Sequence, residues 1–377
     1  MKGNYKIAII FLDEIHHIYH FITTAIELSK TNEVHILTHT GDTRFLSEAL
    51  AELNGDKVIV EKLPTAPFRA FTDKLKGRKL PRKGFWIKKH QEYILDNFDA
   101  ILFTDYFHHY FLKARKHRPI KFIYVEHGTA GRAYSYQKDV LDFDLHLLSG
   151  ESEYRSLKKM NLLNTNFKIT GYCKLDAVRD LNTKAVFSNH KTTVLYNPHF
   201  SPPFSSWHFL GLEILEFFSN SEKYNLIFAP HINLFNKVGG DDISVIPKIY
   251  FKSPNIHIDL GSEKSVNMAY VKEADIYLGD VSSQVFEFIT TPRPCVFLNT
   301  DNVEYKNDIN YRFWKCGDVI NTIGELDDAL RTSSQKFQEK YKAIQEAITE
   351  ENYYREEGST ASQRSAVAII EYLDKNL

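Results

Sequence analysis

Short apolar runs alternate with helix-length segments along most of this chain. In the first half these runs are Lys6–Leu12, Glu33–Thr38, Val58–Val60, Ala100–Phe103, Phe122–Val125, Leu145–Ser149 and Lys168–Thr170. They are rich in β-branched residues and have the length of a buried strand. Strands that alternate with helices form βαβ units, in which neighbouring strands are parallel. The alternation therefore predicts an α/β fold.

The second half of the sequence repeats this pattern. Its predicted strands are Thr193–Asn197, Asn225–Ala229, Ile256–Asp259, Ile276–Gly279 and Cys295–Asn299. Its predicted helices include Phe209–Ser219, Lys264–Lys272, the amphipathic Phe337–Thr349 and the apolar-faced Ala361–Leu373. The first half has one predicted helix around His20–Lys30, directly after the first strand.

The segment Leu181–Lys191 is polar and without a pattern, which predicts a linker. We therefore expect two Rossmann-like domains, residues 1–180 and 190–355, and a C-terminal helix within 356–377 that packs back on the N-terminal domain. This plan resembles the GT-B fold. In such a fold the ligand lies in a cleft between the domains, at the carboxyl ends of both sheets.

The composition excludes several classes of protein. A hydrophobic fraction of 43% among 377 residues is enough for two cores, and a formal net charge of -1 gives no global field for nucleic acid. Three distant cysteines indicate a reducing cytoplasm rather than a disulfide framework. The first residues lack the pattern of a signal peptide, and no apolar run approaches the ~18 residues of a membrane span. Any membrane contact is expected to be peripheral.

The segment Ala274–Phe288 carries the strongest local signal. A predicted strand ends at Gly279-Asp280, and Ser282 and Ser283 then open a helix. Serine hydroxyls and free N–H groups at a helix start are suited to binding phosphate. The alternative is an ordinary capped helix without a ligand.

Two histidines follow predicted strands, one in each domain. Pro230-His231 ends the strand Asn225–Ala229, and His127-Gly128 follows Phe122–Val125. Each imidazole is expected at a carboxyl strand end, and Gly128 would let a ligand approach the backbone. The alternative for either histidine is a surface or core position without chemistry.

Six short motifs occur together in one order. They are His127-Gly-Thr, Asp144–Tyr154, Thr170–Asp176, Tyr196-Asn-Pro, Pro230-His231 and Ala274–Phe288. With this order and spacing, residues 120–310 resemble the CDP-glycerol glycerophosphotransferase family, which includes teichoic acid primases and polymerases. The resemblance implies a metal-independent GT-B enzyme without a cofactor. It would transfer glycerol phosphate from CDP-glycerol to a hydroxyl acceptor on a glycan or lipid and release CMP.

The resemblance also implies roles for individual residues. His127 would be the general base or catalytic histidine, and His231 would contact the donor diphosphate from a Pro230-His231 turn. Asp280, Ser282 and Ser283 would lie at the phosphates, and Glu304 near the donor. The N-terminal domain would be the acceptor side and the C-terminal domain the nucleotide side. The chemistry agrees, since an imidazole with a pKa of ~6.5 suits proton transfer from a hydroxyl.

Four positions depart from the family pattern. Glu126 stands where the family usually has Trp, Ala229 where it has Arg, and Gly279 and Val281 where it has Thr and Tyr. The missing arginine removes a bidentate phosphate contact, for which Lys264 or Arg293 would have to compensate.

The departures leave several functions open. The activated group could be glycerol, ribitol or another polyol. The chain could instead be a GT-B glycosyltransferase that uses a nucleotide sugar, or a non-catalytic binding paralogue. Release of CMP would separate phosphotransfer from sugar transfer, which releases CDP or UDP.

Two histidine-rich loops follow strands of the first half. His16, His17 and His20 follow Lys6–Leu12. Asp105, His108 and His109 follow Ala100–Phe103. Both loops are expected at the acceptor side of the cleft. His16 and His20 share a helix spacing, but without a carboxylate pattern we expect no metal site.

The segment Arg69–Lys89 contains nine Lys or Arg residues and one acid, Asp73. Arg78, Lys79, Arg82 and Lys83 lie at its centre, and Phe85-Trp86 are suited to the headgroup level of a membrane. Each cation near an anionic surface contributes ~1 kcal/mol. The segment predicts contact with an anionic acceptor or with the inner face of a cell membrane. The alternative is a solvated loop and helix face.

Overall fold

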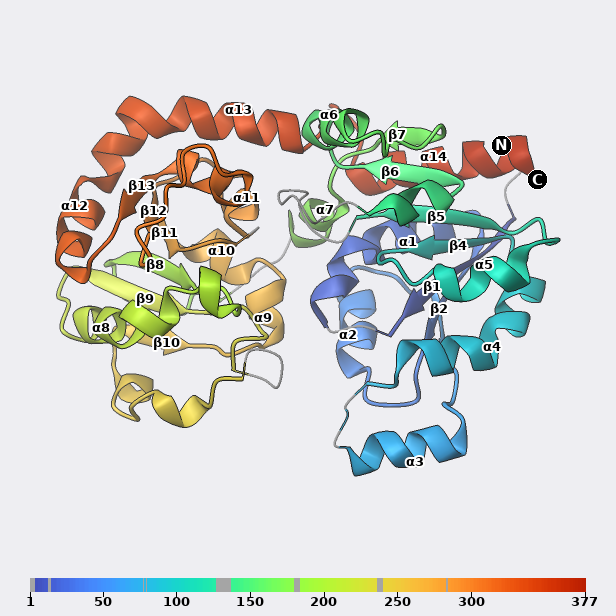
Figure 1. Cartoon of the computed structure of the whole chain (residues 1–377), viewed down its shortest axis with the longest axis horizontal. Coiled ribbons are helices and arrows are strands. Elements are labelled where there is room, and N and C mark those ends of the chain that lie inside the picture. The colour runs from blue at the N-terminus through green and yellow to red at the C-terminus, as the bar shows by residue number, and fades with distance from the viewer. Residues whose placement is uncertain are drawn as a thin grey trace. The chain divides into compact units, whose positions relative to one another are not determined.

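The computed structural model describes residues 4–12, 15–76, 78, 80–126, 137–179, 184–235, 240–282 and 284–377, except for the side chains of residues 16 and 309. The chain forms two compact units (Figure 1). Unit 1 comprises Met1–Thr129, Tyr136–Asp180 and Glu350–Leu377, and unit 2 is built mainly from Leu181–Thr349.

Unit 1 contains a sheet of seven parallel strands in the order β3-β2-β1-β4-β5-β6-β7. The strands are β1 (Lys6–Phe11), β2 (Glu33–Thr38), β3 (Ile59–Lys62), β4 (Ala100–Phe103), β5 (Lys121–Val125), β6 (Leu145–Leu148) and β7 (Phe167–Ile169). Its helices are α1 (Ile22–Ser29), α2 (Arg44–Glu52), α3 (Pro67–Leu75), α4 (Lys83–Asn97), α5 (His109–Arg115), α6 (Glu151–Lys159), α7 (Cys173–Arg179) and α14 (Ala361–Asn376). A 3₁₀ helix, Ile15–His20, precedes α1.

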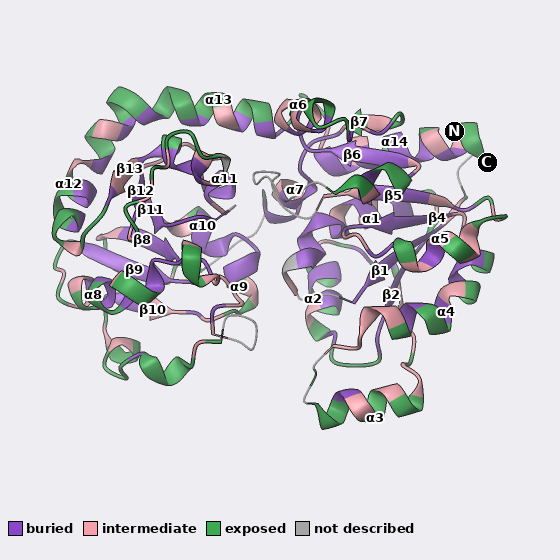
Figure 2. Ribbon diagram, in the orientation of Figure 1, coloured by how far each residue is buried: buried purple, intermediate pink, exposed green. Residues whose placement is uncertain are grey.

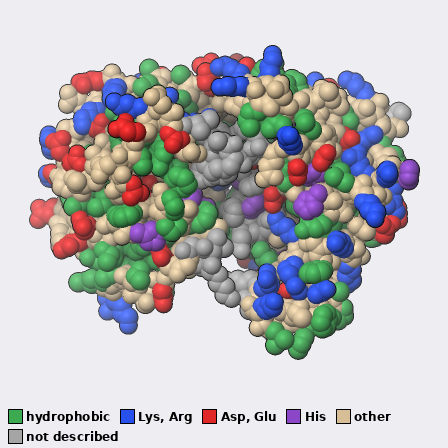
Figure 3. Space-filling view, in the orientation of Figure 1, with side chains coloured by type: hydrophobic (Ala, Val, Ile, Leu, Met, Phe, Trp, Pro, Cys, Tyr) green, Lys and Arg blue, Asp and Glu red, His purple; other side chains and the backbone are tan. Residues whose placement is uncertain are grey.

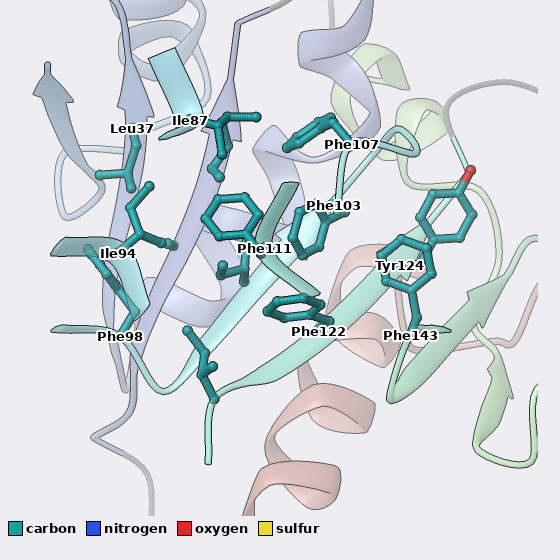
Figure 4. Packing of buried hydrophobic residues seen from close by; sticks show 14 of the residues in the cluster. Leu37, Ile87, Ile94, Phe98, Phe103, Phe107, Phe111, Phe122, Tyr124 and Phe143 are labelled. Atoms are coloured by element: carbon teal, nitrogen blue, oxygen red, sulfur yellow. The ribbon is translucent and has the colours of Figure 1, made fainter. Parts of the chain in front are cut away.

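One face of the unit 1 sheet is covered by α4 and α5. Trp86, Ile87 and Ile94 of α4 and Phe111 of α5 are buried against the sheet residues. Figure 4 shows this aromatic cluster, in which Phe103 and Phe122 lie with ring centroids 5.1 Å apart. Because both faces of a parallel sheet are covered, its central strands are buried throughout, as Figure 2 shows.

Unit 2 contains a sheet of six parallel strands in the order β10-β9-β8-β11-β12-β13. The strands are β8 (Thr192–Asn197), β9 (Tyr224–Phe228), β10 (Ile256–Ile258), β11 (Ile276–Gly279), β12 (Cys295–Leu298) and β13 (Asp318–Ile320). Its helices are α8 (Trp207–Ser219), α9 (Glu263–Val266), α10 (Ala269–Glu273), α11 (Gln284–Phe288), α12 (Leu326–Lys336) and α13 (Lys342–Asn352). The last residues of α13 already belong to unit 1.

The C-terminal helix α14 is part of unit 1. Its start is fixed by Thr360, whose side chain accepts from the Gln363 N–H in a capping box. Within the first turn, the Ser362 N–H and hydroxyl both donate to the Asp176 carboxylate at 2.7 Å. At its other end Asp374 accepts from the Tyr5 hydroxyl. Both ends of α14 are therefore held by residues far away in sequence.

The structure confirms the predicted fold class of two parallel α/β units with C-terminal helices. Two details were wrong. The predicted helix Lys264–Lys272 is split into α9 and α10 by Met268, which has a left-handed φ of 64°. The last strand of unit 2, β13, was not predicted.

Candidate functional site

The neighbouring strands β8 and β9 of unit 2 are followed by the same dipeptide. Their register pairs Tyr196 with Phe228, so Pro198-His199 and Pro230-His231 follow at matching positions. The ladder continues beyond the strands, because the His231 N–H donates to the Pro198 carbonyl at 3.0 Å. The two imidazoles consequently lie together, with ring centroids 5.8 Å apart.

Each imidazole is oriented by its own backbone. His199 Nδ1 accepts from the Ser201 N–H at 3.0 Å, and His231 Nδ1 accepts from the Asn233 N–H at 3.2 Å. An accepting Nδ1 carries no proton, so the neutral ring has its proton on Nε2. Both rings therefore present Nε2–H as a donor, the form that suits a phosphate oxygen.

Asp280 holds the loop that carries His199. Its carboxylate is 2% exposed and accepts from the His199 N–H at 2.9 Å and from the Ser206 N–H and hydroxyl at 2.7 and 2.9 Å. Burial raises the pKa of Asp280 to about 6, although these hydrogen bonds oppose the shift. The structure thus places Asp280 behind the histidines, as an acceptor for backbone N–H groups.

The predicted helix start after β11 is present but short. The Ser282 hydroxyl accepts from the Gln284 N–H at 3.2 Å, while Ser283 lies outside the described residues. The helix that follows, α11, has only five residues. A helix of one turn contributes little dipole, so any phosphate affinity here would come mainly from side chains.

A small pocket lies at the ends of β11 and β12. Its lining residues are Pro203, Phe204, Asp280, Val281, Leu298, Asn299, Thr300, Asp301, Val303, Tyr311 and Trp314. Among these residues, Tyr311 and Trp314 pack against each other, with their ring centroids 4.7 Å apart. Glu304 is exposed on the loop after β12 and is not one of the lining residues. The pocket thus combines aromatic rings in edge-to-face contact with the polar residues Asn299, Thr300 and Asp301.

Of the two cations expected to replace the missing arginine, Arg293 is used elsewhere. Its guanidinium donates to the carbonyls of Ala274, Phe288 and Thr291. Arg293 therefore holds backbone in place and does not face a ligand. Lys264 is exposed in the first turn of α9, after β10.

In unit 1, the corresponding edge of the sheet carries buried acids. Glu126 follows β5, and Glu153 of α6 accepts from the Ser149 N–H and hydroxyl at 2.7 and 2.9 Å. Its other oxygen lies 3.7 Å from Nε2 of the fully buried His146. A small pocket beside this group is lined by His20, Val125, Glu126, Leu147, Ser149, Gly171, Tyr172 and Cys173.

Burial determines the protonation of these unit 1 groups. It raises the pKa of Glu126 well above its ordinary value, and the nearby Glu153 raises it further. Burial raises the pKa of Glu153 to about 7 and lowers that of His146 to about 3. Near neutral pH, His146 is therefore uncharged. The predicted catalytic His127 and its neighbour Gly128 follow Glu126 in sequence and lie outside the described residues.

The two histidine-rich loops of unit 1 are largely buried. His17 and His20 are 8% and 6% exposed, and His108 is fully buried with Nε2 3.2 Å from Asp142. Asp105 pairs with Lys83 at 2.9 Å. The side chain of His16 lies outside the described residues. Within the part of the chain that the structure describes, no three His, Cys, Asp or Glu side chains form a group able to hold a metal ion.

The basic segment Arg69–Lys89 spans α3 and the start of α4, and one expectation for it was wrong. Trp86 is fully buried in the core and donates its indole N–H to the Leu63 carbonyl, so it is not at the surface. Of the four central cations, Arg82 pairs with Asp73 at 2.8 Å and Lys83 with Asp105. Arg78 is exposed, and Lys79 lies outside the described residues. Among the described helices, none is long and apolar enough to cross a membrane.

Sequence reasoning missed His199. The signal was present, because the dipeptide Pro-His follows two neighbouring strands of the same predicted sheet. Only the parallel register of β8 and β9 shows that His199 and His231 lie side by side.

Comparisons with known proteins agree with this fold. A wall teichoic acid polymerase, TagF, superposes with a TM-score of 0.60 at 12% identity, over 98% of this chain and 89% of that one. The UDP-GlcNAc 2-epimerase from Neisseria meningitidis gives 0.60 at 13% identity, over 98% and 100%. The calicheamicin glycosyltransferase CalG4 gives 0.55 at 14% identity, over 99% of each chain. These likenesses establish the GT-B-like fold.

Among curated proteins, none matches the sequence significantly. The sequence model of one family does match, over residues 85–371, which is well over half of the 377 residues and includes parts of both units. The chain therefore belongs to the CDP-glycerol:poly(glycerophosphate) glycerophosphotransferase family and is a transferase.

Proposed function

We propose that this enzyme transfers glycerol phosphate, or a related polyol phosphate, from a CDP-activated donor to a hydroxyl acceptor. The acceptor is a glycan or a lipid-linked chain in the synthesis of a teichoic-acid-like, capsular or lipopolysaccharide polymer. The family match supports the reaction class. The observation that carries the proposal to this chain is the position of His231 after β9. Its N–H donates to the Pro198 carbonyl, and its Nδ1 accepts from the Asn233 N–H, which leaves the proton of the neutral ring on Nε2.

In the proposed reaction, the acceptor oxygen forms a bond to the phosphorus that bears the polyol. The bond from that phosphorus to the oxygen of CMP breaks, and CMP leaves with the electron pair. His127 takes the proton of the acceptor hydroxyl, which a group with a pKa near 6.5 does well at neutral pH. His231 donates to the diphosphate and stabilises the charge on departing CMP. Asp280 holds the loop that carries His199, and no cofactor or metal takes part.

The nucleotide released identifies the reaction. The enzyme is incubated with CDP-glycerol, CDP-ribitol, CMP-sugars or UDP-sugars and an acceptor, and the products are analysed by mass spectrometry. We expect CMP from a CDP-polyol. Release of CDP or UDP from a sugar donor would instead show a glycosyltransferase. Binding without turnover of any donor would show a non-catalytic paralogue.

We further propose that the enzyme works on the inner face of an anionic membrane and docks there through α3. This helix carries Phe68, Phe71 and Leu75 on one face, at spacings of three and four residues. These side chains are 69%, 59% and 71% exposed. Figure 3 shows hydrophobic side chains gathered at this end of unit 1 with Lys and Arg beside them. An exposed apolar face of this kind is typical of an interaction site.

The charges around α3 suit an anionic surface. Lys74, Lys76 and Arg78 are exposed. The sole acid of the segment, Asp73, is 7% exposed and lies 2.8 Å from Arg82 and 3.9 Å from Arg78, so the cations around α3 outnumber it. An amphipathic helix with cations beside large apolar side chains binds at the lipid headgroup level. Phe85, which lies under the Arg69 guanidinium at 3.9 Å, supports the same patch.

Sedimentation with vesicles tests the docking proposal. The triple variant Phe68→Ser, Phe71→Ser, Leu75→Ser should lose binding to phosphatidylglycerol vesicles. So should Lys74→Gln, Lys76→Gln, Arg78→Gln, and wild-type binding should fall as salt rises. A matched control replaces Phe209 and Leu212, which are 54% and 45% exposed on α8, by serine. If the α3 variants pellet like the wild type, the membrane proposal fails. If they pellet normally but lose activity on a soluble acceptor, α3 is part of an acceptor site.

A further inference from the structure

The turns after β8 and β9 are structural copies of each other. Both consist of Pro-His on neighbouring strands, and in both the imidazole Nδ1 accepts from the N–H two residues later. The loops diverge beyond that point, since Ser201 leads toward α8 and Asn233 toward the segment before β10. The shared part is thus limited to the residues that set the direction of each ring.

Phe200 packs against both imidazoles. Its ring lies 4.5 Å from that of His199 and 4.6 Å from that of His231. His199 is 4% exposed, so its ring has little contact with bulk water. Where water is excluded, a hydrogen bond to a charged ligand is stronger than in solvent. The aromatic contact therefore both fixes the spacing of the two rings and strengthens any anion contact they make.

The Asp280 carboxylate accepts from the backbone N–H of His199 and from the N–H and hydroxyl of Ser206. Two imidazoles that both carry Nε2–H, with ring centroids 5.8 Å apart, match a ligand with several anionic oxygens. A diphosphate has this chemistry.

We propose that His199 and His231 form one diphosphate-binding pair, in which His199 supplies a second contact that takes over part of the role of the missing arginine. The inference rests on the proposed function insofar as the diphosphate belongs to a CDP-activated donor. The geometry itself requires only a diphosphate, so inorganic pyrophosphate is a probe independent of that donor.

Two substitutions at the same position separate anion binding from support of the turn. His199→Asn keeps an acceptor near the Nδ1 position, which preserves the bond from Ser201, but removes the Nε2–H donor. His199→Gln keeps an amide donor near the Nε2 position. Calorimetry would measure the affinity of each variant for pyrophosphate and for CDP-glycerol, with circular dichroism and melting curves as the check of folding.

We expect His199→Asn to lose ~10–100-fold in affinity for both ligands, the effect of one hydrogen bond to a charged group, and His199→Gln to regain part of it. The control His257→Asn, in β10 of the same sheet, should leave affinity unchanged. Wild-type affinity of His199→Asn for pyrophosphate, or no binding of pyrophosphate by the wild type, overturns the inference. If pyrophosphate binding depends on His199 but CDP-glycerol does not bind, the pair stands and the proposed donor is wrong.

Discussion

At the carboxyl edge of the unit 2 sheet, two imidazoles lie together with their Nδ1 atoms bonded to backbone N–H groups. At the same edge of the unit 1 sheet, Glu126 and Glu153 lie near a fully buried, uncharged His146. Both sheets are parallel, and the contrast lies in the residues at the strand ends, after β8 and β9 in unit 2 and after β5 and β6 in unit 1. It teaches that a shared fold fixes where chemistry occurs, while the residues after each strand decide which chemistry it is. Imidazole N–H donors suit an anionic group.

The largest expected effect concerns His127, the proposed base, which follows Glu126 in sequence. His127→Ala should lower turnover ~10²–10⁴-fold, the usual effect of losing a general acid or base, while donor affinity changes little. Steady-state kinetics with calorimetry measures both. The exposed His117 of the same unit, replaced by alanine, is the control. Near-normal turnover of His127→Ala would show that His127 is not the base, and the proposed division of roles between the units would then be wrong.

The next effect concerns the support of the unit 2 edge. Asp280→Ala leaves three buried donors without their acceptor, the His199 N–H and the N–H and hydroxyl of Ser206. We expect a loss of roughly 2–5 kcal/mol in the free energy of unfolding of this unit, measured by urea denaturation. Asp301→Ala, an exposed carboxylate beside the same pocket, should change it little. Equal stabilities would mean that Asp280 faces ligand rather than backbone.

The smallest effect concerns the pH dependence of unit 1. Because the pKa of Glu153 is raised to about 7 in the folded state, the folded state binds its proton more tightly than the unfolded chain does. The bound proton contributes to the free energy of unfolding. This contribution is fully present below the ordinary pKa near 4.5 and is lost as pH rises through about 7. The melting temperature should fall by a few degrees over that window, since ~1 kcal/mol shifts it by roughly 2–4 °C. In Glu153→Gln this part of the fall should be absent. A fall of the same size in both proteins would assign the pH dependence to other groups.

Much of the fold could be predicted from the sequence, since buried parallel strands are short, apolar and regularly spaced. β2, β4 and β11 have the predicted bounds. Local patterns were insufficient where a tertiary contact decides the structure. Nothing in the sequence marks Met268 as left-handed, and the basic neighbours of Trp86 conceal that its indole is buried.

The candidate site was less accessible to sequence reasoning than the fold. His231 was identified from a dipeptide after a strand, but the same dipeptide at His199 was passed over because pairing across strands is not visible along the chain. Arg293 was expected to face a ligand, yet three backbone carbonyls bind its guanidinium. A residue type shows what a side chain is able to bind, and only packing shows what it does bind.

The most direct test of the account is the affinity of CDP-glycerol for the wild type and for His231→Ala, measured by calorimetry. His231 is placed at the unit 2 edge by the β9 ladder and oriented by the Asn233 N–H. Because its imidazole is proposed to donate to the diphosphate in the ground state as well as in the transition state, the variant should bind ~10–100-fold more weakly and turn over more slowly. Unchanged affinity in His231→Ala would show that this edge of unit 2 does not bind the donor, and it would contradict the account.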